Sequence, residues 1–354
     1  MVLTRTDPGP TGQFRPAGQH ARVPGGGARS FGQRAAVTAE PTQSEPVVDR
    51  RPPNGRGDAI FAGLARGAGL VILVVLAGVA IFLVIESLPV LSAGSDELPG
   101  GNSNFLTYVA PLVFGTLLAA VIALIIATPL AIAIGLFISH YAPRRLAQGL
   151  GYLVDLLAAV PSVVFGLWGI IALAPRLRGI YEWLADNLGF IPFFAGPASS
   201  TGRTMLTVGV VLAVMILPIM TAICREVFLQ TPVLHEEAAL ALGATRWEMI
   251  QMSVIPYGKS GVVSAAMLGL GRALGETLAV ALVLSVGGGI TFNLISQSNP
   301  STVAANIALQ FPESTGVEIN ALIASGLVLF VITFIVNAGA RAFLARRSEF
   351  SGAN

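Results

Sequence analysis

Long apolar segments alternate with short polar stretches along this chain. They lie at about 68–92, 108–138, 149–174, 204–223, 261–286 and 319–344. A helix needs about 20 consecutive apolar residues to cross the hydrocarbon layer of a bilayer, so the pattern predicts six transmembrane helices. Pro129 and Pro161 lie inside the second and third segments, where we expect kinks in a continuous helix.

The two ends of the chain are polar. Residues 1–58 are rich in Pro, Gly, Arg, Ser and Thr and contain hardly any aliphatic runs, so they cannot bury enough surface to offset the entropy of ordering. We predict a disordered cytoplasmic tail there, which is either a regulatory or lipid-binding arm or a dispensable extension. The first span with its outer loop is then expected at 59–104, the main membrane domain at 105–345, and a short cytoplasmic tail at 346–354.

Basic residues between the segments predict the orientation of the chain, because Lys and Arg near span ends are retained in the cytoplasm. With the N-terminus inside, twelve of them lie on the cytoplasmic side: Arg50, Arg51, Arg56, Arg66, Arg144, Arg145, Arg225, Arg246, Lys259, Arg341, Arg346 and Arg347. Only Arg176, Arg178 and Arg203 lie outside, all between the third and fourth segments. We therefore expect a multi-pass protein of a bacterial cytoplasmic membrane with both termini in the cytoplasm.

The composition excludes several classes of function. With 54% hydrophobic and 11% charged residues among 354, the chain has too few charges to cover a soluble globule of its size. A net charge of +2 with scattered basic residues does not make a nucleic-acid-binding surface. Cys224 is the single cysteine, and His20, His140 and His235 do not have the spacing of metal ligands. We therefore expect an all-α membrane protein with no catalytic centre, metal or cofactor of its own.

The polar segment between the fourth and fifth spans carries the signals of two short helices. Thr231 can cap the first helix with Pro232 at its first position, and Gly243 suits a left-handed helix end. The run Thr245-Arg246-Trp247-Glu248 has the form of a capping box that starts the second helix. Pro256 is expected to stop this helix before the fifth span.

The helix-turn-helix expected at 231–256 contains apolar residues but has no evident core of its own. Leu240, Ile250 and Met252 are expected to stay exposed, and an exposed apolar surface favours a binding partner. An ordinary amphipathic connector between two spans is the alternative interpretation.

This segment resembles the EAA loop of ABC importer permeases, whose pattern is E-A-A-x3-G-x9-I-x-L-P. Here Glu237-Ala238-Ala239 and Gly243 match the pattern, while Ser253 replaces its Ile and Ile255 replaces its Leu. In that family the loop lies in a cleft of a separate ATPase subunit. The resemblance implies an ATPase contact through Glu236, Glu237, Ala238, Ala239, Gly243, Thr245, Arg246, Trp247 and Glu248.

A second apparent motif next to this loop is incomplete. Gly258-Lys259-Ser260 is similar to the end of a P-loop, but the glycine that the motif needs is Ser253 in this chain. Pro256 also interrupts the motif, and no strand precedes it. We therefore expect ATP and Mg²⁺ to bind in a partner chain.

The fifth apolar segment contains two charged residues four positions apart, Arg272 and Glu276. Each buried charge costs roughly 2.5 to 3.5 kcal/mol on insertion scales, so both are expected to face protein or water, on one helical face. Gly271 and Gly275 form a G-x-x-x-G pair that would let a neighbouring backbone approach closely.

Two interpretations of these charges follow. Arg272 and Glu276 either neutralise each other as a structural pair, or Arg272 holds an oxyanion while the carboxylate keeps that binding weak enough for release. Arg before Glu is the less favourable order for an ion pair on a helix, which favours the second interpretation.

Three motifs together are similar to the PstC-type permeases of phosphate-specific ABC importers: Leu157-Ala-Ala-Val-Pro-Ser-Val-Val-Phe-Gly-Leu-Trp-Gly169, Gly243-Ala-Thr-Arg-Trp-Glu248 and Gly271-Arg-Ala-Leu-Gly-Glu-Thr277. The similarity covers roughly 105–345. The sister permease shares the third motif, whereas the second motif and the following Leu278-Ala-Val favour the PstC type. In this family the intramembrane Arg and Glu, which correspond to Arg272 and Glu276, are implicated in phosphate passage.

The resemblance implies the type I ABC importer permease fold with six transmembrane helices and a cytoplasmic coupling helix-turn-helix. It implies a PstA-type sister permease, a dimer of PstB-type ATPase subunits and an extracytoplasmic PstS-type phosphate-binding protein as partners. Transport is then expected by alternating access. The alternatives are a permease for sulfate or molybdate, an ion-coupled carrier with Glu276 as a proton relay, and a membrane scaffold or sensor.

Overall fold

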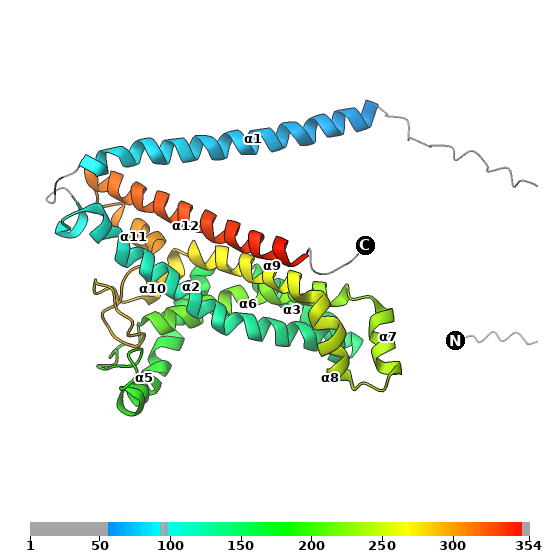
Figure 1. Cartoon of the computed structure of the whole chain (residues 1–354). Coiled ribbons are helices and arrows are strands. Elements are labelled where there is room, and N and C mark those ends of the chain that lie inside the picture. Colours follow the sequence, from blue (N-terminus) through cyan, green and yellow to red (C-terminus); the bar gives the residue numbers. More distant parts are fainter. Residues whose placement is uncertain (1–55, 93, 95–97, 349–354) are drawn as a thin grey trace, which may run out of the picture. The chain divides into compact units, whose positions relative to one another are not determined.

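The computed structural model describes residues 56–92, 94 and 98–348 (Figure 1). The tail predicted at 1–58 lies outside the described residues except for 56–58, and so do residues 349–354 of the C-terminal tail. Every named element of the described residues is a helix, which confirms the prediction of an all-α protein.

Five helical segments of the described residues are long and apolar enough to cross a membrane: Gly57–Val90, Phe105–Tyr141, Ser162–Leu188, Met205–Leu229 and Val317–Ala342. They correspond to α1 (Arg56–Ser87), α2 (Phe105–Leu136) with the π-helical turn η4 (Phe137–Tyr141), α4 (Ser162–Trp168) with η5 (Gly169–Leu173) and α5 (Ala174–Leu188), α6 (Met205–Leu229), and α12 (Val317–Ser348). The first, second, fourth and sixth predicted spans each overlap one of these segments. The third and fifth differ from the prediction.

The third predicted span, 149–174, is divided in two. Helix α3 (Arg144–Ala158) ends at Ala158, and α4 begins at Ser162 after the extended residue Pro161 (φ −59°, ψ 139°). Proline disfavours the helical conformation of the residue before it, so Pro161 breaks the helix instead of kinking it. The crossing segment therefore begins at Ser162 and reaches Leu188, and the separate α3 precedes it.

The fifth predicted span, 261–286, is also interrupted. Helix α9 (Ile255–Leu274) ends at Gly275, and the six-residue helix α10 (Leu278–Val283) follows. Glycine weakens a helix interior, and the side chain of Glu276 accepts a hydrogen bond from the backbone N–H of Ala279 at 3.2 Å. This bond satisfies a donor at the start of α10 that has no partner within a helix, so the chain ends one helix and starts another here.

Small residues let α2 and α6 pack closely at the centre of the bundle. Ala119, Ala120, Ala123, Ala127 and Ala131 of α2 are almost completely buried. They recur at helical spacing, so one face of α2 carries no large side chain, and short side chains allow helix backbones to approach. This pair, with α9 packed against α6, forms the core to which the functional elements are attached.

Gly209 of α6 is one of these close approaches, and a larger residue there is expected to destabilise the protein. A Cβ atom at Gly209 would overlap the side chain of Ile122, and overpacking typically costs about 1–3 kcal/mol. Gly209→Val should therefore lower the melting temperature of the purified protein, measured by thermal unfolding in detergent. Gly149→Ala is the matched control, because a Cβ atom there meets nothing within 4 Å; equal melting temperatures for the two variants would contradict the packing argument.

Arg203, one of the three basic residues predicted to lie on the outer side, has a structural partner. Its guanidinium donates to the carbonyl oxygens of Leu282, Val283 and Leu284 at 3.1, 3.3 and 3.2 Å. These carbonyls lie at the C-terminal end of α10, where a helix has unpaired acceptors and favours a cation. Arg203 therefore holds α10 in place against the start of α6.

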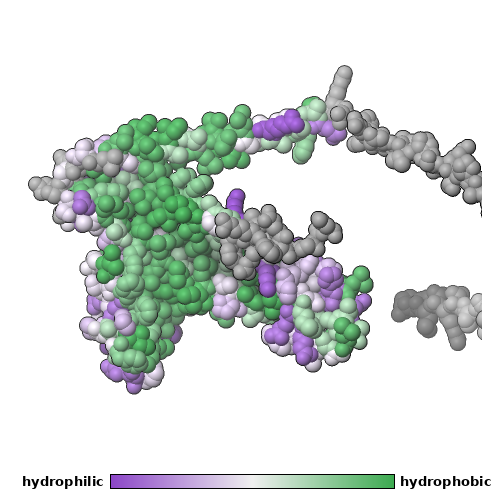
Figure 2. All heavy atoms as spheres, viewed as in Figure 1, coloured by the Kyte–Doolittle hydropathy of each residue, from purple (hydrophilic) through white to green (hydrophobic). Residues whose placement is uncertain are grey.

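Apolar side chains cover the faces of the helices that no other helix of this chain covers. Figure 2 shows hydrophobic residues over the middle of the helices and hydrophilic residues around α7 (Val233–Ala241) and α8 (Arg246–Met249). On α1 the consecutive residues Leu70, Val71, Ile72 and Leu73 are all 61–64% exposed. A helix that is apolar all round is typical of a membrane span, and the chain is therefore a multi-pass membrane protein.

Candidate functional site

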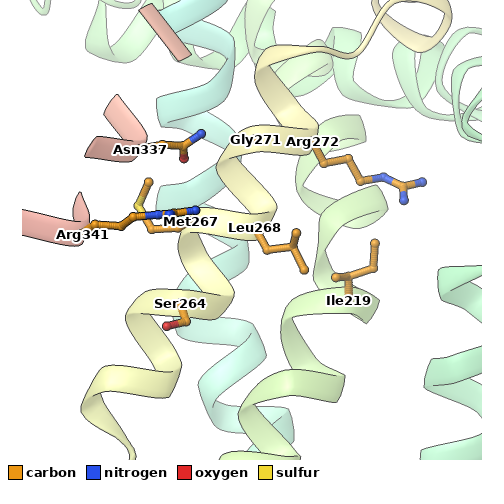
Figure 3. Close-up of a pocket in the computed structure, with 8 residues that line it drawn as sticks. All are labelled: Ile219, Ser264, Met267, Leu268, Gly271, Arg272, Asn337 and Arg341. Carbon is orange, nitrogen blue, oxygen red and sulfur yellow. The ribbon is translucent and has the colours of Figure 1, made fainter. Parts of the chain in front are cut away.

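Arg272 faces a pocket of about 670 Å³ between three helices (Figure 3). The pocket is lined by one residue of α6, five of α9 and two of α12: Ile219, Ser264, Met267, Leu268, Gly271, Arg272, Asn337 and Arg341. Figure 3 shows Arg272 and Leu268 on the side of α9 that faces Ile219, with Asn337 and Arg341 on the other side. The polar lining consists of two guanidinium groups, an amide and a hydroxyl, and it includes no carboxylate.

Arg272 and Glu276 form no salt bridge with each other in the described structure. Arg272 is partly buried, and its Nε atom is buried without a hydrogen-bond partner in the described structure. An unpaired buried donor costs roughly 1–3 kcal/mol. Arg272 and Glu276 therefore do not form the structural pair in this conformation, and Nε of Arg272 has no hydrogen-bond partner within the described chain.

The expected common face of Arg272 and Glu276 is also wrong, because α9 ends between them. Glu276 is 9% exposed, and its carboxylate accepts the hydrogen bond that starts α10. The backbone N–H groups at a helix start favour a negative charge. Glu276 thus stabilises the start of α10 and with it the interruption between α9 and α10.

The close helix contact predicted at Gly271 and Gly275 is not found within the described chain. A Cβ atom at Gly271 would meet nothing within 4 Å, and the nearest atom to one at Gly275 is the carbonyl oxygen of Gly271 at 3.7 Å. The close contacts of α9 with α6 lie instead at Gly258, Gly261 and Gly269, where a Cβ atom would, respectively, be 2.8 Å from Phe228, overlap the side chain of Val227, and be 2.8 Å from the sulfur of Met220. Helix α9 therefore packs on α6 through these glycines and leaves the Gly271 side open toward the pocket.

The helix-turn-helix predicted at 231–256 is present, and its local signals are largely confirmed. Helices α7 and α8 are joined by a turn in which Gly243 has φ +87°. In the capping box, Glu248 N–H donates to Thr245 Oγ1 at 3.3 Å and Thr245 N–H donates to the Glu248 carboxylate at 2.7 Å. The backbone N–H and the hydroxyl of Thr245 both donate to the Glu248 carboxylate and lower its pKa, so the box persists at neutral pH and is lost as the pH falls through that lowered pKa.

Three details of this segment correct the prediction. Thr231 does not cap α7: the helix begins at Val233, and the Thr231 hydroxyl is buried without a hydrogen-bond partner in the described structure. Pro256 does not stop the second helix, because the π-helical turn η6 (Ile250–Val254) joins α8 to α9. Its wider turn lets Ile255 N–H bond the carbonyl of Ile250, so the chain stays helical into Pro256, which has no N–H to donate. Ile250 is buried, at 1% exposure.

The surface of α7 and α8 still carries large exposed side chains. Leu242 is 90% exposed, Leu234 is 76% exposed and Trp247 is 51% exposed. Of the residues implied to contact an ATPase, all but Glu236 and Ala239 are exposed: Glu237, Ala238, Gly243, Thr245, Arg246, Trp247 and Glu248. An apolar surface ringed by charges is typical of a protein interface.

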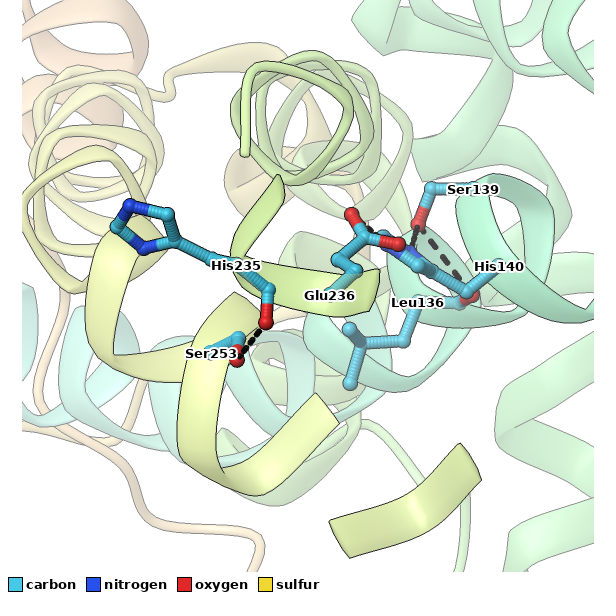
Figure 4. A network of polar contacts seen from close by, with 6 residues as sticks. All are labelled: Leu136, Ser139, His140, His235, Glu236 and Ser253. Carbon is cyan, nitrogen blue, oxygen red and sulfur yellow. Dashed lines mark hydrogen bonds and ion pairs between the residues drawn. The ribbon is translucent and has the colours of Figure 1, made fainter. Parts of the chain in front are cut away.

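Two polar contacts that sequence reasoning missed attach α7 to the rest of the chain (Figure 4). Ser253 Oγ donates to the carbonyl oxygen of His235 at 3.2 Å, and His140 Nε2 lies 3.4 Å from the carboxylate of Glu236. Neither contact could be predicted from a local pattern, because the two residues of each pair are far apart in the sequence.

The described residues contain no group of three or more His, Cys, Asp or Glu residues that could hold a metal ion. Gly258, Lys259 and Ser260 lie inside α9, whereas a P-loop requires a loop between a strand and a helix.

Residues 129–349 match the family model described as "Binding-protein-dependent transport system inner membrane component". "Phosphate transport system permease protein PstC 2" of Mycobacterium tuberculosis is 47% identical over 307 residues, which cover 84% of this chain and 94% of that protein. The PstC protein of Mesorhizobium japonicum is 39% identical over 84% of this chain and 92% of its own length. A crystal structure of a bacterial ABC transporter that imports alginate has a TM-score of 0.47 at 15% identity, covering 81% of this chain and 99% of that chain.

Proposed function

Because the chain belongs to the family of binding-protein-dependent transport system inner membrane components, we propose that it is a permease subunit of an ATP-driven phosphate importer. The observation that carries the proposal is 47% identity, over 84% of the chain, to a protein named as a phosphate transport permease. The pocket at Arg272 adds a site whose charged lining is entirely cationic, as an oxyanion requires.

We assign six crossings to the chain, with α9 and α10 together as the fifth. The 20 residues of α9 extend about 30 Å at 1.5 Å per residue, which is the thickness of the hydrocarbon layer. With six crossings, the distribution of basic residues supports a cytoplasmic position for both termini and for the α7–α8 surface.

In this arrangement the α7–α8 surface binds one of two ATPase subunits, which hold ATP and Mg²⁺. A sister permease lines the other half of the pathway, and an external binding protein delivers phosphate. This chain performs no covalent chemistry. Closure of the ATPases moves α7 and α8, and the pathway then opens alternately to each side.

Arg272 is the proposed phosphate contact on this pathway. A guanidinium can donate two parallel hydrogen bonds to an oxyanion and stays charged at every working pH. Glu276 acts on the same site by fixing the end of α9, and Arg341 adds a second positive charge on the pocket wall.

Reconstitution into vesicles tests the proposed function. With the sister permease, the ATPase and the phosphate-binding protein, we expect ATP-dependent uptake of labelled phosphate that excess sulfate or molybdate does not compete away. Without the ATPase we expect no uptake, even with a proton gradient, because this chain has no energy source of its own. Accumulation on a proton gradient by the chain alone would identify a secondary carrier, and competition by sulfate or molybdate would identify a different substrate.

A further inference from the structure

Two neighbouring glutamates of α7 have different surroundings. Glu237 is exposed, whereas the side chain of Glu236 is 22% exposed and faces the end of α2. Successive residues of a helix point about 100° apart, so one carboxylate is available to a partner while the other is turned toward the membrane domain. Glu237 is therefore placed to contact a partner, whereas Glu236 contacts the membrane domain of this chain.

The partner of Glu236 is His140, in the π-helical turn η4 at the end of α2 (Figure 4). His140 Nε2 lies 3.4 Å from Glu236 Oε1, and the side chain of His140 is 9% exposed. The other ring nitrogen, Nδ1, lies 2.7 Å from Ser139 Oγ, which also lies 3.3 Å from the carbonyl oxygen of Leu136. Both ring nitrogens thus have polar partners, and the imidazole orientation is determined from both sides.

These contacts define which hydrogen bonds Glu236 and His140 can form. Glu236 as a carboxylate accepts only, so His140 Nε2 must carry the proton that is shared with it. Ser139 can either donate to Nδ1 of a neutral ring or accept from Nδ1–H of a protonated ring while it donates to Leu136. The Nε2–H donor toward Glu236 is present in both states.

The contact between Glu236 and His140 joins α7 to η4, two elements that lie far apart in the sequence. Apart from the chain itself, which enters α7 from α6, the segment is attached through Ser253 to η6 and through Glu236 to η4. Helix α2 packs along α6 more extensively than any other pair of elements in the described structure. A displacement of α7 reaches α6 along the chain, and the contact between Glu236 and His140 is a second route, which leads directly to the end of α2.

We propose that His140 and Glu236 form a positioning link that transmits movement of α7 to the inner end of α2. The inference rests on the proposed function, in which the ATPase binds the α7–α8 surface. Glu237 then contributes to binding of the ATPase, and Glu236 transmits the movement of α7 to α2 once the ATPase is bound.

The test uses the complete reconstituted importer and two readouts: ATPase retained on purification, and phosphate transported per ATP hydrolysed. In Glu236→Gln and in His140→Gln we expect normal retention and a fall in phosphate per ATP of about 2- to 30-fold, the range for residues that carry coupling between sites. The double variant should be no worse than either single variant. The exchanged pair, His140→Glu with Glu236→His, should recover most of the ratio, which also shows that the single variants fold.

Glu237→Gln is the matched control for charge loss, and it should weaken ATPase retention. If Glu237→Gln retains the ATPase normally, the proposed docking surface is wrong, whereas the link is judged by the Glu236 and His140 variants. Loss of retention in Glu236→Gln, an unchanged ratio, or additive effects of the two single variants would each overturn the link.

Discussion

Replacing Arg272 with glutamine is expected to abolish phosphate uptake and to leave the ATPase bound. Arg272 lines the pocket and forms no ion pair with Glu276 among the described residues, so we expect its guanidinium to bind the anion there. Hydrogen bonds to charged groups contribute roughly 1.5–3 kcal/mol each, and loss of two parallel bonds would weaken anion binding about 100-fold or more. Labelled phosphate uptake by cells, together with purification of the complex, measures both effects.

Two further variants sharpen this prediction. Arg272→Lys keeps the charge but loses the planar pair of donors, so uptake should be intermediate. Arg178→Gln removes a guanidinium that pairs with Glu182 at 2.8 Å on an exposed surface, and uptake should remain near normal because exposed pairs contribute little. Normal uptake in Arg272→Gln would exclude Arg272 from the pathway.

Reversing the charge of Glu237 is expected to detach the ATPase and thereby to stop uptake. Glu237 is exposed on α7 beside Leu234 and Trp247 on the α7–α8 surface, which are 76% and 51% exposed. Opposed like charges at an interface cost several kcal/mol, and each 1.4 kcal/mol is tenfold in affinity. The ATPase should therefore be lost when the complex with Glu237→Lys is purified.

The same reversal at Glu313 is the control for charge. Glu313 is exposed in the loop before α12, well apart in the sequence from α7 and α8, and Glu313→Lys should retain both the ATPase and uptake. Retention of the ATPase in Glu237→Lys would show that the EAA-like segment does not dock as proposed.

Local features of the molecule could be predicted from short stretches of sequence. The capping box at Thr245 and Glu248 and the left-handed turn at Gly243 both occur as predicted. Such signals depend on residues within one turn of each other, but they are not all realised: Thr231 does not cap α7, and Pro256 does not stop the helix before it. The four uninterrupted spans were predictable for a similar reason, because an apolar run of sufficient length is sufficient to cross a bilayer.

The interrupted spans could not be predicted from hydropathy. Pro161 and Gly275 lie within apolar runs that continue on both sides, so a count of apolar residues cannot distinguish a kink from a break. The hydrogen bond from Ala279 to Glu276 and the wide turn before Pro256 decide where each helix ends. The expected common helical face of Arg272 and Glu276 was wrong because it assumed a continuous helix, whereas α9 ends at Leu274.

By itself the sequence determined that the chain is helical and membrane-spanning, and that it carries an exposed helix-turn-helix of the EAA type. Tertiary structure decided that Arg272 lines a pocket, that α9 packs closely on α6 at glycines that include Gly269, and that Glu236 lies against His140. The physical reason is the range of each interaction. Hydropathy and capping act over neighbouring residues, whereas the partner of a buried charge is chosen by the packing of helices that are distant in the chain.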